Sequence, residues 1–282
     1  MVDGDEMKIQ QIKAGKYTLS FAGRTLVMGI LNVTPDSFSD GGKYHRVDLA
    51  VAHAEQMVRD GADIIDVGGE STRPGHQPVS VAEELRRTIP VIEALATRLD
   101  CPLSIDTSKS EVAQAAVEAG ASIINDVWGA KRDPDIAKVA AQYQVPIVLM
   151  HNRTDVNYQS LMEDIRTDLL KSVEIALEHG VTKENIILDP GIGFAKNLEQ
   201  NLTVMRNLEQ IVDLGYPVLL GTSRKSMIGK VLKLPVDQRV EGTAATVALG
   251  IAKGCQIVRV HDVKEMVRVT RMMDAMLYGT DA

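Results

Sequence analysis

The sequence predicts an α/β protein built as a single (β/α)₈ barrel, a TIM barrel, with a short N-terminal β-hairpin. Three observations predict this fold: eight short apolar runs, helical stretches between them, and polar residues gathered where the runs end. The length of 282 residues suits one such barrel. We expect one domain over residues 1–282, with residues 1–23 as the hairpin extension.

The first segment, before Arg24, has the pattern of two short strands turning at Ala14-Gly15. We expect this hairpin to close the bottom of the barrel. The chain start shows no apolar core of a secretory signal, and no run of 18 apolar residues occurs in the sequence. We therefore expect a cytoplasmic protein that does not enter membranes.

Composition narrows the class of function. Apolar residues make up 45% and charged residues 24%, as in ordinary globular proteins. The net charge of −7 argues against electrostatic binding of nucleic acid. Cys101 and Cys255 both stand beside apolar runs, which predicts two buried free thiols.

The eight apolar runs predict the strands of the barrel. They are rich in Ile, Val and Leu and do not alternate with polar residues, which is typical of parallel strands covered on both faces. The predicted strands span 26–31, 63–67, 102–105, 121–124, 146–150, 185–188, 217–220 and 256–260.

Amphipathic stretches between these runs predict the helices, for example at 81–99, 158–179 and 197–214. Ser80 and Ser108 each stand three residues before a glutamate, which is the pattern of a capping box. Asp133 precedes a proline and predicts another helix start. Glycines stand where helices should end, at Gly61, Gly120, Gly180, Gly215 and Gly254.

Polar residues collect at the predicted strand ends, whereas the strand starts carry Pro, Cys, Ala or Asn. In barrels of this class the catalytic site lies at the carboxyl ends of the strands. The sequence therefore predicts a site on one rim. Its candidates include Asn32, Asp106, Asn125, Asp126, His151, Asp189, Lys225, Ser226, Arg259 and His261.

Asp106, Asn125 and Asp189 form the first group of candidates. Two carboxylates and an amide can accept hydrogen bonds from a flat heterocycle that displays several N–H donors, such as a 2-amino-4-oxo pterin or guanine edge. Asp126 fits two interpretations, because it either joins this group or caps its own loop.

Lys225, Arg259 and His261, with Ser226, form a cationic group after the last two strands. Barrels often bind phosphate there, and Ser226 is expected to open a short helix. Asn32 is either a turn former or a ligand of Mg²⁺ held by a diphosphate.

Other barrel chemistries fit poorly. A metal-dependent hydrolase needs several histidines at strand ends, but the first strand has none and only His151 and His261 reach the rim. Both cysteines stand at strand beginnings, and no spacing supports a Ser-His-Asp triad.

At these residues the chain closely resembles the dihydropteroate synthase family of pterin-binding barrels, in its bacterial, Gram-positive-like form. The resemblance rests on seven segments in family order, from about residue 25 to the C-terminus. They are GILNVTPDSFSDGG (29–42), DVGGESTRPG (66–75), SIDTSK (104–109), IIND (123–126), LDPGIGF (188–194), GTSRKSMIG (221–229) and VRVHDV (258–263).

The resemblance implies an enzyme that joins 6-hydroxymethyl-7,8-dihydropterin diphosphate to p-aminobenzoate, releasing diphosphate and giving 7,8-dihydropteroate. It assigns the pterin to Asp106, Asn125, Asp189 and Lys225, with Met150 against the ring. It assigns Mg²⁺ and diphosphate to Asn32, Arg259 and His261. The p-aminobenzoate pocket would use Phe38, Thr72, Arg73, Pro74 and Ser226, while Asp40, Phe194 and Gly221 complete the substrate-binding set. The catalytic residues it implies are Asp106, Lys225, Arg259 and His261.

Two rivals share parts of this pattern. A methyltetrahydrofolate-dependent methyltransferase would use the same pterin acceptors but should lack the diphosphate site at Lys225, Ser226, Arg259 and His261. A non-catalytic pterin-binding protein would not need the loops at 33–42 and 68–75. The family resemblance also implies sulfonamide sensitivity and a homodimer. Four methionines at 266, 272, 273 and 276 fit either a dimer contact or barrel packing.

Overall fold

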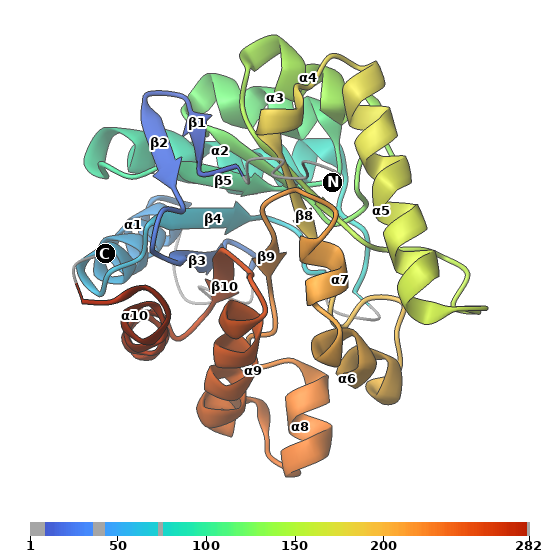
Figure 1. Ribbon diagram of the computed structural model, residues 1–282. Coiled ribbons are helices and arrows are strands. Elements are labelled where there is room, and N and C mark those ends of the chain that lie inside the picture. Colours follow the sequence, from blue (N-terminus) through green and yellow to red (C-terminus); the bar gives the residue numbers. More distant parts are fainter. Residues whose placement is uncertain (1–8, 36–42, 73–75, 281–282) are drawn as a thin grey trace.

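A ring of parallel strands with helices around its outside forms the body of the protein, as the computed structural model shows (Figure 1). The structure describes residues 9–35, 43–72 and 76–280. Eight strands pair in the order β8-β7-β6-β5-β4-β3-β10-β9. A parallel bridge between Leu188 and Val218 brings β8 to the segment that leads into β9, so the sheet closes on itself. The predicted α/β barrel is confirmed.

The strands lie where the apolar runs predicted them. Parallel register places their carboxyl ends at the same rim, with Asp106 opposite Asn125 and Met150 opposite Asp189. The strands are β3 (Leu26–Asn32), β4 (Ile64–Gly68), β5 (Leu103–Asp106), β6 (Ile123–Asp126), β7 (Ile147–Met150), β8 (Ile186–Asp189), β9 (Leu219–Leu220) and β10 (Ile257–Val260).

The N-terminal hairpin closes the opposite end of the barrel, as predicted. Its strands β1 (Gln11–Ala14) and β2 (Tyr17–Ser20) pair antiparallel around Gly15, which has a φ of +61°. Ile12, Leu19 and Phe21 are buried in one apolar cluster with residues from the first halves of the barrel strands. This cluster seals the barrel below the site without using polar groups.

The helices lie between the strands, but the predicted helix at 197–214 is divided. Asn207 ends α6 with its amide donating to the Thr203 carbonyl at 2.8 Å, and a second short helix follows. The helices are α1 (Lys43–Arg59), α2 (Val81–Arg98), α3 (Ser110–Ala119), α4 (Asp135–Tyr143), α5 (Leu161–Glu178), α6 (Leu198–Arg206), α7 (Glu209–Val212), α8 (Ser226–Leu232), α9 (Val240–Ala252) and α10 (Val263–Tyr278).

Helix capping follows the sequence at one predicted start and departs from it at another. Ser80 accepts from the Glu83 amide at 3.2 Å and caps α2 as expected. The predicted capping box at Ser108 is wrong, because α3 begins later and the Ser110 amide donates to Asp133 at 2.7 Å. The Asp133 side chain therefore caps α3 and not α4, the helix that follows it. A local sequence pattern cannot reveal such a contact between distant residues.

Several smaller predictions are confirmed. All five glycines expected to end helices have φ between 88° and 126°. Cys101 and Cys255 are buried and free. Burial raises the pKa of Cys101 to about 11 and that of Cys255 to about 12, so neither thiol is a nucleophile at neutral pH. Within the described residues, no helix combines the length and apolarity needed to span a bilayer.

The four methionines of α10 divide between the two expected uses. Met266 is buried in the core and Met273 packs against it. Met272 and Met276 are instead about 60% exposed, at 60% and 61%. The stripe therefore serves barrel packing on one side and leaves an apolar edge on the other.

Candidate active site

The first group of predicted residues meets at the carboxyl end of the barrel. Asp106 and Asp189 end β5 and β8, Asn125 is the last but one residue of β6, and all three side chains are buried. The pairing of β5 with β6 puts Asp106 beside Asn125, and Asp189 reaches the same rim from two strands further round. The prediction that these acceptors share one pocket of the rim fits the arrangement of the strands.

Asp66 is a site residue that the sequence reasoning missed. It lies inside β4, fully buried, and one of its oxygens accepts from Arg259 Nε at 2.7 Å and from Asn125 Nδ2 at 3.1 Å. Its other oxygen, Oδ1, is buried and has no partner among the described atoms. An aspartate within an apolar run was the available signal, since a buried carboxylate must be paired with a donor.

Arg259 links this carboxylate to the first group. Its Nη2 donates to Asp106 at 3.1 Å, while its Nε is held by Asp66. The two bonds fix the plane of the guanidinium, and a guanidinium has three further N–H groups that can face an anion. Although burial opposes charge, the neighbouring Asp66 and Asp106 raise the pKa of Arg259 above its usual value.

Asn125 is oriented by the same contact. Because an ionised Asp66 can only accept, the amide nitrogen of Asn125 must face it. The amide oxygen then faces the other way and is available to a ligand N–H.

Asp106 has an unusual protonation equilibrium. Burial and the nearby Asp66 raise its pKa to about 8, against the opposing effect of Arg259. Asp106 can therefore hold or release a proton near neutral pH, unlike an ordinary aspartate.

Asp189 faces the second cation of the site. Burial raises the pKa of Asp189, whereas Lys225 and a hydrogen bond from the Gly191 amide, at 2.8 Å, favour its charged form. Burial in turn lowers the pKa of Lys225 to about 8. The Lys225 ammonium donates to the Ile192 carbonyl and lies 5.1 Å from the centre of the Phe194 ring.

Gly221 directly follows β9 and lies next to Lys225. A Cβ atom built on Gly221 would stand 3.9 Å from Lys225 Nζ and 3.9 Å from the Cβ of Arg259. Gly221 is thus adjacent to both predicted cations, in agreement with its expected place in the site.

The remaining predicted cations and polar residues lie further out on the rim. His261 Nδ1 and Ser223 Oγ share a hydrogen bond of 2.8 Å, and the same hydroxyl accepts from the His261 amide at 3.0 Å. Ser226 opens α8, as expected, and is exposed. Met150 is buried at the end of β7, in register with Asp189.

A cavity of about 500 Å³ opens beside these residues. Thr72, Asp106 and Phe194 line it, together with Trp128 and Arg132. The Arg132 guanidinium stacks 4.7 Å from the Trp128 ring, so one wall is both aromatic and cationic. This volume is within the range of small-molecule sites.

The loop after β4 is tied to the barrel by one lysine. Lys109 donates to Glu70 at 2.5 Å and to the buried Glu84 at 2.6 Å. Arg87 also donates to the Gly69 carbonyl at 2.8 Å. These bonds hold the described start of this loop, up to Thr72, against α2.

Asn32 ends β3 and is exposed at the rim. Within the described residues no group of three His, Cys, Asp or Glu side chains could hold a metal ion. A single amide oxygen suits Mg²⁺, which keeps several waters and binds mainly through substrate phosphates. Asn32 therefore fits a metal that is carried by a diphosphate better than a metal held by the protein alone.

Of the two interpretations of Asp126, the structure shows the cap of its own loop. Asp126 caps its own loop, accepting from the amides of Trp128 at 2.9 Å and Ala130 at 2.7 Å. Phe38, Asp40, Arg73 and Pro74 lie outside the described residues.

The chain matches a family model described as "Pterin binding enzyme" over residues 28–261. It is 62% identical over 268 residues to the dihydropteroate synthase of Bacillus subtilis, covering 95% of this chain and 94% of the relative.

Solved structures agree with this match. A dihydropteroate synthase from Clostridium difficile, determined in the presence of pteroic acid, is 55% identical with a TM-score of 0.88, covering 90% of this chain and 97% of the other. The dihydropteroate synthase of Yersinia pestis, in a sulfonamide drug complex, is 43% identical with a TM-score of 0.89, covering 95% and 99%.

Proposed function

The chain belongs to the pterin-binding enzymes and, among them, to the dihydropteroate synthase family; from this premise we propose how its rim carries out the reaction. The enzyme transfers a pterinylmethyl group. It condenses 6-hydroxymethyl-7,8-dihydropterin diphosphate with p-aminobenzoate and yields 7,8-dihydropteroate and diphosphate.

One observation supports the assignment of roles: a group of buried acceptors and a group of cations share a single rim. Asp106, Asn125 and Asp189 supply acceptors for the N–H groups of the pterin, and Lys225 lies beside them. Arg259, held by Asp66 and Asp106, supplies the positive charge for the diphosphate. A site for methyl transfer would need the first set without the second.

The reaction requires stabilisation of the charges on the pterin and on the leaving diphosphate. It does not require a strong base. The bond between the pterin methylene carbon and the diphosphate oxygen breaks, and its electron pair leaves with the diphosphate. The amine nitrogen of p-aminobenzoate then attacks the methylene carbon and loses a proton. Asp106 in its anionic form stabilises the positive charge on the pterin, while Arg259 and His261 stabilise the leaving group.

Mg²⁺ is part of this proposal, with Asn32 as its protein ligand. When bound, the ion neutralises charge on the departing diphosphate. Arg259 and His261 lie on β10 or directly after it, and β10 pairs with β3, the strand that ends in Asn32. The residues that would handle the phosphates thus come from adjacent strands.

The p-aminobenzoate pocket is proposed at the outer side of the same rim, with Thr72 and Ser226 from the described residues and Phe38, Arg73 and Pro74 from the others. The cavity beside Thr72 and Phe194 supports this location. Asp40 would assist at this side. A sulfonamide would compete with p-aminobenzoate there.

We further propose a homodimer in the cytoplasm. Val231, Leu232 and Val236 are 44–53% exposed on and after α8, and Met272 and Met276 add apolar surface on α10. Such a surface suits association of two copies. Sedimentation equilibrium would test the dimer.

One assay separates the proposed function from its rivals. Purified protein is mixed with the dihydropterin diphosphate, p-aminobenzoate and Mg²⁺, and both dihydropteroate and diphosphate are measured. We expect the two products in equal amounts. Pterin binding without turnover would support a non-catalytic binder, and methyl transfer from methyltetrahydrofolate without diphosphate chemistry would support the methyltransferase.

A further inference from the structure

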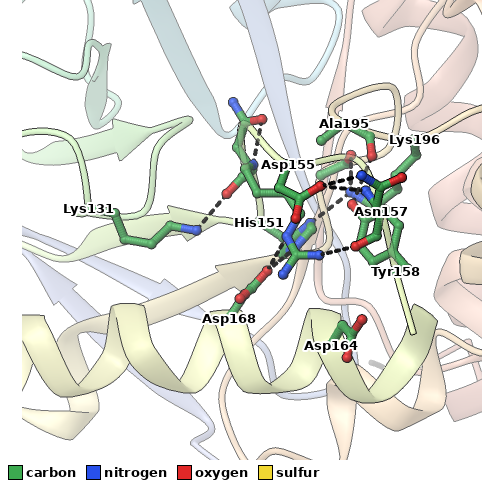
Figure 2. Close-up of polar contacts among 12 residues, drawn as sticks. Lys131, His151, Asp155, Asn157, Tyr158, Asp164, Asp168, Ala195 and Lys196 are labelled. Atoms are coloured by element: carbon green, nitrogen blue, oxygen red, sulfur yellow. Dashed lines mark hydrogen bonds and ion pairs between the residues drawn. The ribbon is translucent and has the colours of Figure 1, made fainter. Parts of the chain in front are cut away.

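A buried polar chain lies behind the active-site rim and none of its members belongs to the ligand-binding set. It runs from Asp168 on α5, through His151 at the end of β7, to Lys196 just before α6 (Figure 2). Figure 2 shows these side chains converging from three separate elements. His151 is 1% exposed. A structural barrel has no need of a buried lysine at this place, because burial of an ammonium is costly unless it is fully bonded.

Lys196 is fully bonded. Its ammonium contacts His151 Nδ1 at 2.8 Å and donates to the carbonyls of Gly191 and Phe194, both at 2.9 Å. An ammonium has three N–H donors, and here each has one acceptor. A neutral amine, with two N–H groups, could not donate all three bonds.

The two carbonyls belong to the loop that carries the pterin-facing groups. In this loop the Gly191 amide fixes the Asp189 carboxylate, and the Ile192 carbonyl accepts from Lys225. Lys196 thus bonds the loop at Gly191 and Phe194, on either side of Ile192, whose carbonyl accepts from Lys225. Movement of the loop would change the positions of Asp189 and Lys225 together.

The loop is closely packed against its neighbours. Gly191 has a φ of +70°, and a Cβ atom there would lie 2.0 Å from the His151 carbonyl oxygen. The Gly193 amide donates to Asn201 at 2.9 Å, so α6 holds the loop from its other side. The loop is packed directly against His151. Lys196 can therefore bond His151 and the loop carbonyls at the same time.

His151 must be neutral to accept from Lys196. Its Nε2 then carries the proton and donates to Asp168 Oδ2 at 2.9 Å. Burial lowers the pKa of His151 to about 4, which keeps the ring neutral. Arg153 Nε lies 3.1 Å from the same Asp168 oxygen and helps to keep this carboxylate ionised, so Asp168 selects the ring tautomer.

We propose that Lys196, with His151 and Asp168 behind it, positions the loop at residues 189–194 and thereby sets the geometry of the pterin subsite. Lys196 is a positioning residue, since it acts through backbone carbonyls and does not touch the ligand. The inference rests on the proposed function, because it assumes that Asp189 and Lys225 face a pterin.

The main test is calorimetry with pteroic acid and, separately, inorganic diphosphate with Mg²⁺, at pH 6.5. The pH is chosen because burial lowers the pKa of Lys196 to about 7. Lys196→Met should weaken pteroic acid binding about tenfold and leave diphosphate binding within about twofold, since Arg259 lies on β10 and His261 directly after it, away from this loop. The stoichiometry should stay that of the wild type.

Lys253→Met is the matched control. Lys253 also makes an ion pair, at 2.7 Å to Glu209, but it stands at the end of α9 near the opposite end of the barrel. This variant should bind both ligands as the wild type does. A purely structural role for Lys196 would lower the folded fraction and hence the stoichiometry, without changing the dissociation constant of the folded protein.

Asp168→Asn gives a second test if the lysine variant fails to fold. An asparagine can donate to the ring as well as accept from it, so it no longer selects the tautomer that Lys196 requires. Pteroic acid binding should weaken about threefold, and ¹⁵N NMR of the histidine rings should show His151 losing its single Nε2–H form.

The outcomes are distinct. If wild-type protein does not bind pteroic acid at all, the proposed function is wrong. If wild type binds it and both Lys196→Met and Asp168→Asn bind it within twofold of wild type, the positioning role is wrong. Equal losses of pteroic acid and diphosphate affinity would also overturn it.

Discussion

The two ends of the barrel use the same strands for opposite purposes. Along β4, Ile64 packs in the apolar cluster at the bottom, and Asp66, two residues on, bonds Arg259. Along β10, Ile257 packs in that cluster and Arg259 follows two residues later. Two residues span roughly 6.6 Å of strand, so the interior changes from apolar to ionic within that distance.

The difference shows where stability and function are located. The lower end is sealed by Ile12, Leu19 and Phe21 of the hairpin region and gains the free energy of apolar burial. The upper end holds buried carboxylates whose pKa values are raised by burial, which costs folding free energy. The rim is therefore kept in a less stable state that suits ligand binding, and the bottom offsets it.

The largest expected effect comes from removing the cation of the upper end. Arg259→Met should lower turnover at least about 1000-fold, because the diphosphate loses its fixed positive charge and Asp66 and Asp106 lose their partner. Pteroic acid should still bind. Diphosphate release measured at saturating substrates tests this.

A control for that variant exists at the bottom. Arg24 donates to Asp63 at 2.6 Å, but its side chain is 50% exposed. Arg24→Met should leave turnover within about twofold, because exposed ion pairs contribute little. If both arginine variants lost turnover equally, the distinction between the two ends would fail.

The next effect is on stability. Phe21→Ala should lower the free energy of unfolding by about 3 kcal/mol, since it opens a cavity in the apolar cluster of the lower end. Urea denaturation gives this value. Affinity of the folded protein for pteroic acid should stay within about twofold, and a large loss of affinity would show that the two ends are coupled.

A smaller effect is expected at one acceptor of the rim. Asp189→Asn should weaken pteroic acid binding about tenfold or more, a loss of roughly 1.5–3 kcal/mol, because an amide replaces charge-assisted acceptors with one acceptor and a misplaced donor. Calorimetry would measure it, with Asp63→Asn at the bottom as the control. Unchanged affinity would remove Asp189 from the site.

The last effect is on the pH dependence of stability. Burial, with Asp66 nearby, raises the pKa of Asp106 to about 8 in the folded protein, so protonated Asp106 favours folding relative to the unfolded chain. This contribution is present below about pH 4 and is lost as the pH rises through 8.

The measurement compares wild type with Asp106→Asn, which has no such carboxyl. The free energy of unfolding of wild type should fall relative to the variant by about 3 kcal/mol between pH 5 and pH 8. Parallel curves for the two proteins over this range would mean that Asp106 is already ionised at pH 5.

Local sequence patterns were sufficient to predict the strands, the helices and the rim. Each strand is predicted by its own apolar run and five helix ends by their own glycines, so these predictions depend on neighbours within a few residues. The position of a residue at a strand end also places it on the rim, because parallel strands in a barrel run in one direction. Asp106, Asn125, Asp189 and Arg259 could therefore be assigned to one site before any contact was known.

Local sequence patterns predicted helix ends less well where another side-chain hydrogen bond competes with the pattern. Ser108 has the spacing of a capping box, but the amide at the start of α3 donates to Asp133 instead. The helical pattern at 197–214 continues past Asn207, whose side chain ends α6 by bonding a backbone carbonyl. In both places the competing hydrogen bond decided the outcome.

The pairing of the charges, by contrast, depends on the folded barrel. Arg259 meets Asp66 across 193 residues of sequence, and Lys196 meets His151 across 45. No periodicity encodes such distances, because pairing of buried charges depends on which side chains the closed barrel brings within 3 Å of one another. The sequence thus defines the rim on which the chemistry takes place, and closure of the barrel defines how its charges are shared.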